Sequence, residues 1–143
     1  MVEIRVITEE DAESVASLST QLGYESNVDQ TLLRIRRIND CIENCAFAAL
    51  VDDKVVGWIH GFYTLRIESD SFVEIGGLVV DSAYRNLKIG KQLIERVKLW
   101  AKQHQVKKLK VRCNIIRTES HKFYERLGFK ENKRQIAFEI DLD

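Results

Sequence analysis

The sequence predicts an α/β fold in which a mixed, largely antiparallel sheet carries helices on both faces. Apolar residues recur at the periods of strands and helices in the order β α α β β β α β α β. A helix separates the strands expected at 72–80 and 108–114, and such a unit joins its strands in parallel with a right-handed crossover. The short turn at 52–54 instead predicts an antiparallel hairpin.

The first half of the chain predicts one strand, two helices and that hairpin. Residues 2–6 alternate apolar and charged side chains, which is typical of a half-buried strand. Thr8 is suited to cap a helix that ends at Gly23, because acids fill its first turn. A second helix is expected over 27–40, and the runs 45–51 and 55–63 are the strands of the hairpin.

The second half predicts three strands and two helices. In the run 71–80, Gly76 and Gly77 indicate a bulge or a close approach of backbone. One apolar face runs from Ile89 to His104, and a shorter helix is expected over 118–127, with Gly128 beyond its end. The alternation at 108–114 predicts a strand, and the alternation at 134–142, with Ile136, Phe138, Ile140 and Leu142 on one side, predicts a final one.

Composition favours one soluble domain over residues 1–143. The chain has 143 residues and is 45% hydrophobic, which suits a single packed core. We expect an intracellular, cytoplasmic protein with no membrane partner, because no apolar run approaches a membrane span and the first residues lack the order of a secretion signal. The cysteines Cys41, Cys45 and Cys113 are odd in number and are expected to be reduced.

Charge is balanced overall and uneven along the chain. The 22 basic and 22 acidic residues cancel, which argues against a nucleic-acid partner. Residues 84–112 hold ten Lys and Arg and one acid, whereas residues 1–83 hold six basic residues and 15 acids. This asymmetry suggests a region suited to an anionic ligand, although solvated helix and strand faces are the ordinary alternative. His60 and His104 have no metal-like spacing, so no metal is expected.

The stretch "VDSAYRNLKIGKQL", residues 80–93, passes from a strand into a helix. The first N–H groups of a helix and the positive end of its dipole can bind an anion. Gly90 removes a side chain where a ligand would approach the backbone, and Arg85, Lys88 and Lys91 surround that point with positive charge. A plain strand-to-helix turn is the alternative that these residues leave open.

"LVVDSAYRNLKIGKQL" resembles the acetyl-CoA signature of the GCN5-related N-acetyltransferase superfamily, which reads Arg or Gln, two residues, Gly, one residue, then Gly or Ala. Arg85 fills the first position and Gly90 the last, while Lys88 stands where the first glycine is usual. "HKFYERLGF" is similar to the second motif of that family, at the expected distance. The resemblance implies a sheet that splays between two central parallel strands.

The resemblance also implies acetyl-CoA as co-substrate. The arm of acetyl-CoA is implied to lie in the gap between the parallel strands, where the amide of Val80 would donate to the carbonyl oxygen. The residues implied to bind it are Leu78, Val79, Val80, Arg85, Asn86, Leu87, Lys88, Ile89, Gly90, Lys91, Asn114, Arg117, His121 and Phe123.

Two residues are candidates for catalysis. Tyr124 matches the family tyrosine that protonates the departing thiolate; a core side chain is the alternative reading. Glu74, two residues before the glycine pair, is the candidate base, with a strand-edge carboxylate as the alternative. From loop position, Tyr24, Glu25, Tyr63 and Arg66 are expected to line the acceptor site.

The function implied is transfer of an acetyl group to a primary amine of a small molecule, by direct attack in a ternary complex. "RTESHKFY", residues 117–124, is similar to the pattern of small-molecule members such as aminoglycoside or aminoalkylphosphonate acetyltransferases. Acetylation of a protein N-terminus or lysine is one alternative, and binding of acetyl-CoA without turnover is another. The family also admits a homodimer.

Overall fold

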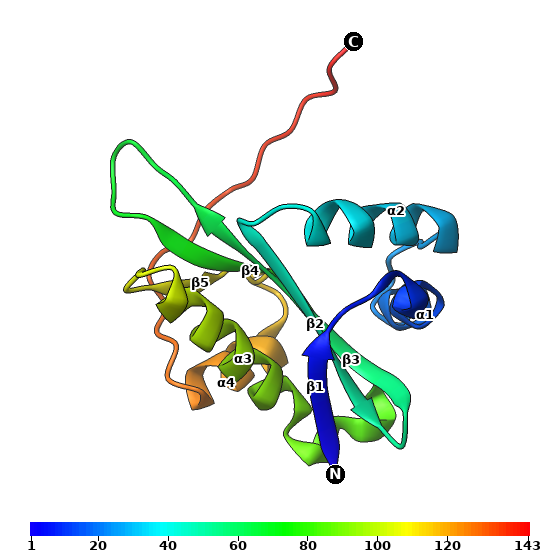
Figure 1. The fold of residues 1–143 in the computed structure, drawn as a ribbon. Coiled ribbons are helices and arrows are strands. Elements are labelled where there is room, and N and C mark those ends of the chain that lie inside the picture. The colour runs from blue at the N-terminus through cyan, green and yellow to red at the C-terminus, as the bar shows by residue number, and fades with distance from the viewer. The chain divides into compact units, whose positions relative to one another are not determined.

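The computed structural model describes residues 1–143, apart from the side chain of Asn86. The chain divides into two compact units, residues 1–111 and 112–143, so a single domain stays a prediction. The first unit contains β1 (Val2–Val6), the 3₁₀ turn η1 (Glu9–Asp11), α1 (Ala12–Gln21), α2 (Val28–Asn39), β2 (Asn44–Val51), β3 (Lys54–Thr64), β4 (Phe72–Val80), the 3₁₀ turn η2 (Ser82–Leu87), α3 (Ile89–Gln103) and β5 (Leu109–Val111). The second unit contains α4 (Thr118–Arg126) (Figure 1).

The strands form one mixed sheet in the order β1-β2-β3-β4-β5. The first three pairings are antiparallel and β4–β5 is parallel, which confirms the predicted fold class and the parallel pairing of the two strands that a helix separates. The parallel pairing joins only Val73–Ile75 to Leu109–Val111, so β5 is shorter than the expected 108–114. Beyond Ile75, β4 has no described pairing with β5, and the two strands part there.

Helices cover both faces of this sheet, as expected (Figure 1). On one face, Leu18 of α1 and Ile35 of α2 pack in a cluster with Ala48 of β2. On the other face α3 lies against β3. A Cβ built on Gly57 would meet Ile89 at 3.3 Å, which shows how closely that helix approaches the sheet. The four predicted helices all form within a few residues of their expected bounds.

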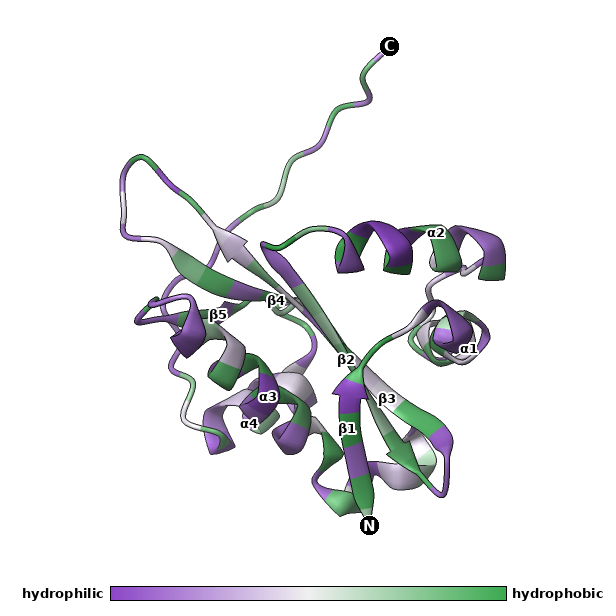
Figure 2. Cartoon of the chain, in the orientation of Figure 1, coloured by the Kyte–Doolittle hydropathy of each residue, from purple (hydrophilic) through white to green (hydrophobic). Residues whose placement is uncertain are grey.

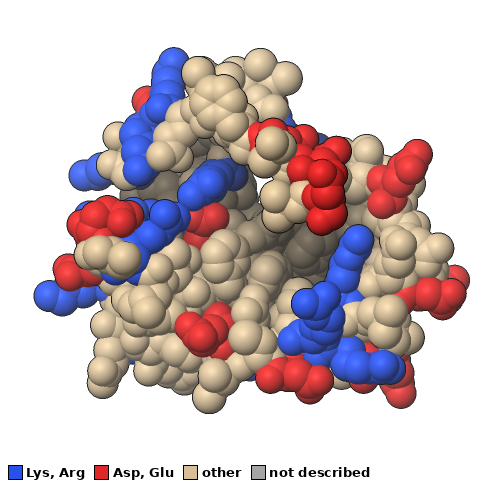
Figure 3. Space-filling view, turned by 90° about the horizontal axis from the view of Figure 1, so that it is seen from above, with Lys and Arg blue, Asp and Glu red and all other residues tan. Residues whose placement is uncertain are grey.

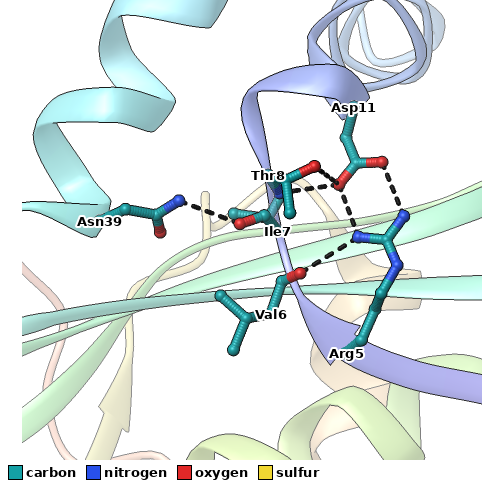
Figure 4. A network of polar contacts seen from close by, with 6 residues as sticks. All are labelled: Arg5, Val6, Ile7, Thr8, Asp11 and Asn39. Carbon is teal, nitrogen blue, oxygen red and sulfur yellow. Dashed lines mark hydrogen bonds and ion pairs between the residues drawn. The ribbon is translucent and has the colours of Figure 1, made fainter.

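The corner between β1 and α1 is held by polar contacts around one carboxylate (Figure 4). Arg5 donates from both terminal nitrogens to the two oxygens of Asp11, each at 2.8 Å, and the Thr8 N–H donates to Asp11 Oδ2 at 2.8 Å. The Asn39 amide donates to the Ile7 carbonyl oxygen at 2.9 Å and joins α2 to the same corner. Burial acts to raise the pKa of Asp11, but the hydrogen bonds from Arg5 and Thr8 outweigh it and leave this pKa below its ordinary value.

The predicted final strand at 134–142 is wrong for this chain taken singly: residues 130–143 form no strand and run as an extended tail (Figure 1). Ile136, Phe138, Ile140 and Leu142 are 80 to 90% exposed. The physical reason is that a strand requires hydrogen bonds to a neighbouring strand, which alternation in the sequence does not supply. With no strand beyond β5 in the described chain, the parallel pair lies at the end of the sheet.

No helix in the described part of the chain is long and apolar enough to cross a membrane. A cytoplasmic location stays a prediction.

Candidate functional site

The glycine pair of β4 forms the predicted bulge. His60 lies opposite Gly77 and Gly61 opposite Ile75, so Gly76 is the extra residue. A Cβ on Gly76 would lie 2.7 Å from His60 Nδ1, and a Cβ on Gly77 would lie 2.8 Å from the ring of Trp58. Because β3 side chains approach the backbone this closely, only glycine fits at either position.

The bulge also decides which backbone groups of β4 face away from β3. In an antiparallel pair, opposite residues alternate between hydrogen-bonded and non-hydrogen-bonded pairs. The Asp81 N–H donates to the Val56 carbonyl at 2.8 Å, so the next pair, Val80 with Gly57, is of the non-hydrogen-bonded kind. By the same alternation, the pair of Leu78 with Ile59 is also non-hydrogen-bonded. The N–H and C=O groups of Leu78 and Val80 therefore point to the side of β4 where β5 does not pair.

Before the bulge the alternation has the opposite phase. The Val73 N–H donates to the Lys108 carbonyl at 3.1 Å, so an odd-numbered residue faces β5 there. The extra residue Gly76 shifts the phase by one, and even-numbered residues face that side afterwards. Val79 is different from Leu78 and Val80: its side chain is 4% exposed and packs in the core under α1 and α2.

The turn after β4 is opened by Asp81. Its side chain accepts from the Ala83 N–H at 3.0 Å, and its carbonyl accepts from the Tyr84 N–H at 2.9 Å. The turn closes at Lys88, whose φ of 56° and ψ of 31° are left-handed. Since a glycine adopts this conformation more readily, Lys88 occupies the place of the family glycine at a conformational cost.

The helix α3 begins directly after this left-handed residue. Its first internal hydrogen bond runs from the Gln92 N–H to the Lys88 carbonyl at 3.1 Å. The N–H groups of Ile89, Gly90 and Lys91 therefore precede the helical ladder, and Lys88 makes no side-chain cap at this end. An anion at this end of the helix would meet these donors and the positive end of the helix dipole.

The side chains of the turn differ in exposure. Arg85, Leu87, Lys88 and Lys91 are exposed, whereas Ile89 is 1% exposed and is a core residue. Asn86, which was expected to bind acetyl-CoA, has a side chain outside the described part of the structure. Lys88 and Lys91 border an open groove of about 550 Å³ along α3, lined as well by Ile4, Leu87, Gln92, Glu95, Arg96 and Leu99. Both lysines are thus accessible to a ligand.

Glu74 lies on the face of the sheet that α1 and α2 cover. It is opposite Phe62, and residues directly opposite in a sheet share a face. His60 is on that face too, and its Nε2 lies 2.7 Å from the side-chain oxygen of Asn44. Because that oxygen accepts, Nε2 carries the proton and Nδ1 presents a lone pair toward the bulge. Burial lowers the pKa of His60 and favours this neutral ring.

Sequence reasoning assigned no role to His60. Trp58, His60 and Phe62 are two residues apart along the strand, so the sequence already indicates that their three rings share one face. The strand register was needed to show that this face lies against the glycine bulge.

The second unit gathers the remaining predicted residues around α4. The Tyr124 ring lies 5.2 Å from that of Phe123 and 5.5 Å from that of Phe129, in edge-to-face arrangements. Burial, and to a smaller extent Cys113, raise the pKa of Tyr124 to about 12 against the opposing effect of Arg117. The phenol therefore keeps its proton at neutral pH.

The start of α4 is tied to the segment before it. His121 Nε2 donates to the Asn114 carbonyl at 2.9 Å, and the Arg117 N–H donates to the same oxygen at 3.0 Å. The Asn114 side chain accepts from the Ile116 N–H at 3.1 Å. Asn114, Arg117 and His121 are thus brought together, and these contacts hold the loop before α4.

The four residues expected to bind the acceptor are not all brought together. Tyr24 and Glu25 are exposed in the link between α1 and α2. The Tyr63 ring lies 6.2 Å from the ring of His104, the residue directly after α3. Tyr63 is therefore on the face of the sheet that α3 covers, opposite to the face covered by α1 and α2. Arg66 lies in the exposed loop after β3, with its guanidinium 5.7 Å from the Phe72 ring.

The described residues include no group of three or more His, Cys, Asp or Glu that could hold a metal ion. All three cysteines are free, and burial raises the pKa of Cys45 to about 12, so its thiol is neutral. Lys and Arg are interspersed with Asp and Glu on the face drawn in Figure 3, and neither sign covers that face.

Residues 12–129 match the model of the acetyltransferase (GNAT) family. The chain belongs to this family. Acetyl-CoA is the co-substrate of its members, as the resemblance implied.

The chain is 30% identical over 133 residues to an aminoalkylphosphonate N-acetyltransferase of Salmonella typhimurium, covering 91% of this chain and 86% of the relative. It is 32% identical over 87 residues to the N-acetylaspartate synthetase of Mus musculus, covering 61% of this chain and 28% of that relative. The chain thus spans less than a third of the length of that synthetase.

Solved structures share the fold of the GNAT chain. An aminoglycoside 6'-N-acetyltransferase from Acinetobacter baumannii superposes with a TM-score of 0.88 at 20% identity, over all of both chains. The aminoglycoside acetyltransferase AAC(6')-Iy, in complex with a bisubstrate analogue of CoA and acetylneamine, superposes with a TM-score of 0.87 at 23% identity, over 99% of each chain. These likenesses confirm the predicted α/β architecture.

Proposed function

We propose that this GNAT chain transfers the acetyl group of acetyl-CoA to a primary amine of a small molecule, by direct attack of the amine in a ternary complex. The observation that carries the proposal is the bulge at Gly76. It turns the backbone groups of Leu78 and Val80 toward the unpaired side of β4, immediately before a turn with exposed helix N–H groups. The amide groups in the extended arm of acetyl-CoA can pair with the first set, and its phosphates can be held by the second.

The chemistry divides among residues of this chain. An alkyl ammonium has a pKa of about 10.4 and is therefore mostly protonated at neutral pH. The acceptor must lose a proton before its nitrogen can attack. Glu74 is proposed as the group that takes this proton, directly or through water. The Val80 N–H is proposed to donate to the carbonyl oxygen as negative charge develops on it.

The new C–N bond forms as the C–S bond breaks, and coenzyme A leaves as its thiol. Tyr124 is proposed to supply the proton that the sulfur needs. Its phenol, with a pKa of about 12, holds a proton at neutral pH, which this role requires. The buried thiol of Cys45 is unsuited to act as a nucleophile, and direct attack requires no covalent enzyme intermediate.

The small-molecule acceptor class is supported by two relatives. The Salmonella relative, which covers most of this chain, is named for aminoalkylphosphonates, and a structural neighbour was captured with an acetylneamine analogue. Tyr24, Glu25, Tyr63 and Arg66 are kept as proposed acceptor contacts, and Tyr63 is the least favoured of them because it faces α3.

The test of the proposed function is release of free coenzyme A in the presence of amines. A panel of aminoalkylphosphonates, aminoglycosides, amino acids and lysine peptides should include small amines that raise the release rate above that with water alone. Binding of acetyl-CoA with no amine or peptide raising this release would show a binding module instead. Stimulation by peptides alone would show a protein acetyltransferase.

Two variants test the residue roles. Tyr124→Phe should lower turnover about a hundredfold with little change in acetyl-CoA affinity, because only the transferred proton is removed. Glu74→Gln should lower turnover and change the acidic side of the pH–rate profile, because a base acts only after it has lost its own proton. The control Glu43→Gln alters an exposed carboxylate at the start of the hairpin and should leave the profile unchanged. An unaltered profile in Glu74→Gln would remove that residue as the base.

A further inference from the structure

Two rings of β3 lie over the bulge of β4. A Cβ built on Gly76 would be 2.7 Å from His60 Nδ1 and 3.0 Å from Phe62 Cε1. The pairing of β4 with β5 ends at Ile75, so the outer side of β4 is unpaired from Gly76 onward in the described pairing. The His60 side chain is half-buried, and Nδ1 is its ring atom nearest the bulge. A molecule bound at the bulge would therefore meet this nitrogen.

The orientation of the His60 ring is set by a chain of two hydrogen bonds. The Asn44 amide nitrogen donates to Cys41 Sγ at 3.2 Å, which leaves the amide oxygen facing His60 Nε2 at 2.7 Å. Asn44 is the polar start of a strand that is otherwise hydrophobic (Figure 2). Because an amide oxygen only accepts, Nε2 carries the proton and Nδ1 keeps its lone pair. A base that a third group orients in this way is prepared to take a proton.

The surroundings of His60 favour a neutral ring. Burial lowers its pKa, so the imidazole is uncharged at neutral pH. Register and contacts place two titratable groups on this side of the ring, Glu74 of β4 and Cys41 before β2. The buried side chains of the covering helices, such as Leu18 of α1 and Ile35 of α2, carry no charge. The ring is thus able to act as a proton acceptor.

Acetylation of an ammonium requires two protons to leave the same nitrogen. An alkylammonium and a thioester give an amide, a thiol and one free proton. The first proton must leave before attack, because it occupies the lone pair, and this is the step proposed for Glu74. The second must leave as the C–N bond forms, because the attacking nitrogen becomes positively charged. A carboxylate that has taken the first proton cannot take the second until it has released the first.

We propose that His60 takes the second proton: as the amine nitrogen attacks the thioester carbon, one of its N–H groups donates to Nδ1 and that proton passes to the ring. The electron pair of this N–H bond stays on the nitrogen, which becomes the amide nitrogen as the C–S bond breaks. The Nε2–H keeps its hydrogen bond to Asn44 throughout, and the ring then releases its proton to solvent. This inference rests on the proposed function and adds a catalytic residue to it.

The first test compares His60→Gln with Glu74→Gln on two acceptors, by release of free coenzyme A. The probe is aminoethylphosphonate, or the panel amine that the wild type acetylates fastest, together with a fluorinated analogue whose amino group is already neutral at the assay pH. With the basic amine, both variants should turn over at least about tenfold more slowly than the wild type. With the neutral amine the first proton is absent, so Glu74→Gln should approach the wild type while His60→Gln stays slow.

The outcomes separate this inference from the proposed function. An active wild type together with an undiminished His60→Gln would overturn the role of His60 and leave acetyl transfer in place. Recovery of His60→Gln with the neutral amine would also overturn it, because the ring would then serve removal of the first proton. A wild type that releases coenzyme A with no amine would overturn the proposed function, and this inference with it. Unchanged acetyl-CoA affinity of His60→Gln, measured by titration, is the control for folding.

The second test keeps the ring and changes its partner. Asn44→Asp places a carboxylate against the Nε2–H, which stabilises the imidazolium and raises the pKa of His60. Because His60 must be neutral to take a proton, the acid-side midpoint of kcat/KM should move to higher pH. Asn27→Asp is the matched control at the exposed start of α2, where the side chain accepts from the Asp29 N–H at 2.9 Å, and it should leave the midpoint unchanged. An unmoved midpoint in Asn44→Asp would overturn the proposal.

Discussion

Two strand-to-helix corners of the GNAT chain solve the same local problem in opposite ways. At the corner from β1 to α1, the Asp11 carboxylate accepts from the Thr8 N–H and from Arg5, so the polar groups are satisfied by the chain itself. At the corner from β4 to α3, the capping position is the left-handed Lys88, which makes no side-chain cap. The N–H groups that follow it remain available to an external anion.

The comparison teaches how function can be recognised at a helix start. A corner that uses an acid to satisfy its own donors has no use for an anionic ligand, and its residues serve stability. A corner that leaves its helix N–H groups uncapped and places exposed Arg85, Lys88 and Lys91 near them gives up that stabilisation, and it is the corner that we propose binds the phosphates of acetyl-CoA. Stability and acetyl-CoA affinity should therefore respond separately to changes at the two corners.

The largest effect on stability is expected at the first corner. Asp11→Ala should lower the free energy of unfolding by about 2 kcal/mol, because Arg5 and the Thr8 N–H lose their shared acceptor in a partly buried place. Acetyl-CoA affinity should not change. Urea unfolding and acetyl-CoA titration measure the two quantities. Glu9→Ala is the control: it removes the exposed ion pair with Arg36, at 2.7 Å, and should change the free energy of unfolding far less than Asp11→Ala does.

The same carboxylate predicts a dependence on pH. The folded pKa of Asp11 lies below its ordinary value of 3.8, so its contribution is complete above pH 3.8 and is lost as the pH falls through the folded pKa. Wild-type stability should therefore fall more steeply with acid than that of Asp11→Asn. Parallel acid unfolding curves would show that Asp11 adds nothing beyond burial.

The second corner should control affinity. Lys88→Glu with Lys91→Glu should raise the acetyl-CoA dissociation constant at least about tenfold, because two positive charges beside the proposed phosphate site become negative. Unfolding should change little. The matched control is Lys102→Glu with Lys107→Glu, which alters charge equally at exposed positions near the far end of α3. Equal loss in both double variants would reduce the effect to net charge alone.

A smaller effect separates conformation from charge at Lys88. Lys88→Gly should raise the free energy of unfolding by about 1 kcal/mol, because glycine adopts the left-handed conformation without the steric cost paid by lysine. Lys98→Gly, inside α3, should lower it by about 1 kcal/mol. Acetyl-CoA affinity of Lys88→Gly should fall severalfold through loss of one charge. An affinity equal to wild type would place the Lys88 side chain clear of the ligand.

The smallest effect is expected on the strand beside the second corner. Burial lowers the pKa of His60 from 6.5. Below pH 6.5 the imidazole is therefore protonated more fully in the unfolded chain than in the folded chain, and this difference favours unfolding. Wild-type stability should decrease as the pH falls below 6.5, and His60→Gln should lack this slope. Urea unfolding across that range measures it. Equal slopes in both proteins would show that the ring is hydrated in solution.

Much of the fold could be predicted because its signals are local. The alternation in residues 2–6, the cap at Thr8 and the apolar faces of α1, α2 and α3 each depend on neighbours a few residues away. The bulge was predicted from Gly76 and Gly77, since paired glycines within a strand have few other uses. The prediction of a strand at 134–142 was wrong because alternation of apolar and polar residues does not specify a neighbouring strand for hydrogen bonding.

Sequence alone determined the acetyl-CoA signature, the chemical types at Glu74 and Tyr124, and the places where helices begin, because these depend on residue identity and spacing. Tertiary structure decided which way each group faces. The register of β3 against β4 aimed Leu78 and Val80 outward, put Val79 and Ile89 in the core and brought His60 beside the bulge. A shift of one residue reverses every such direction, and no local pattern specifies it.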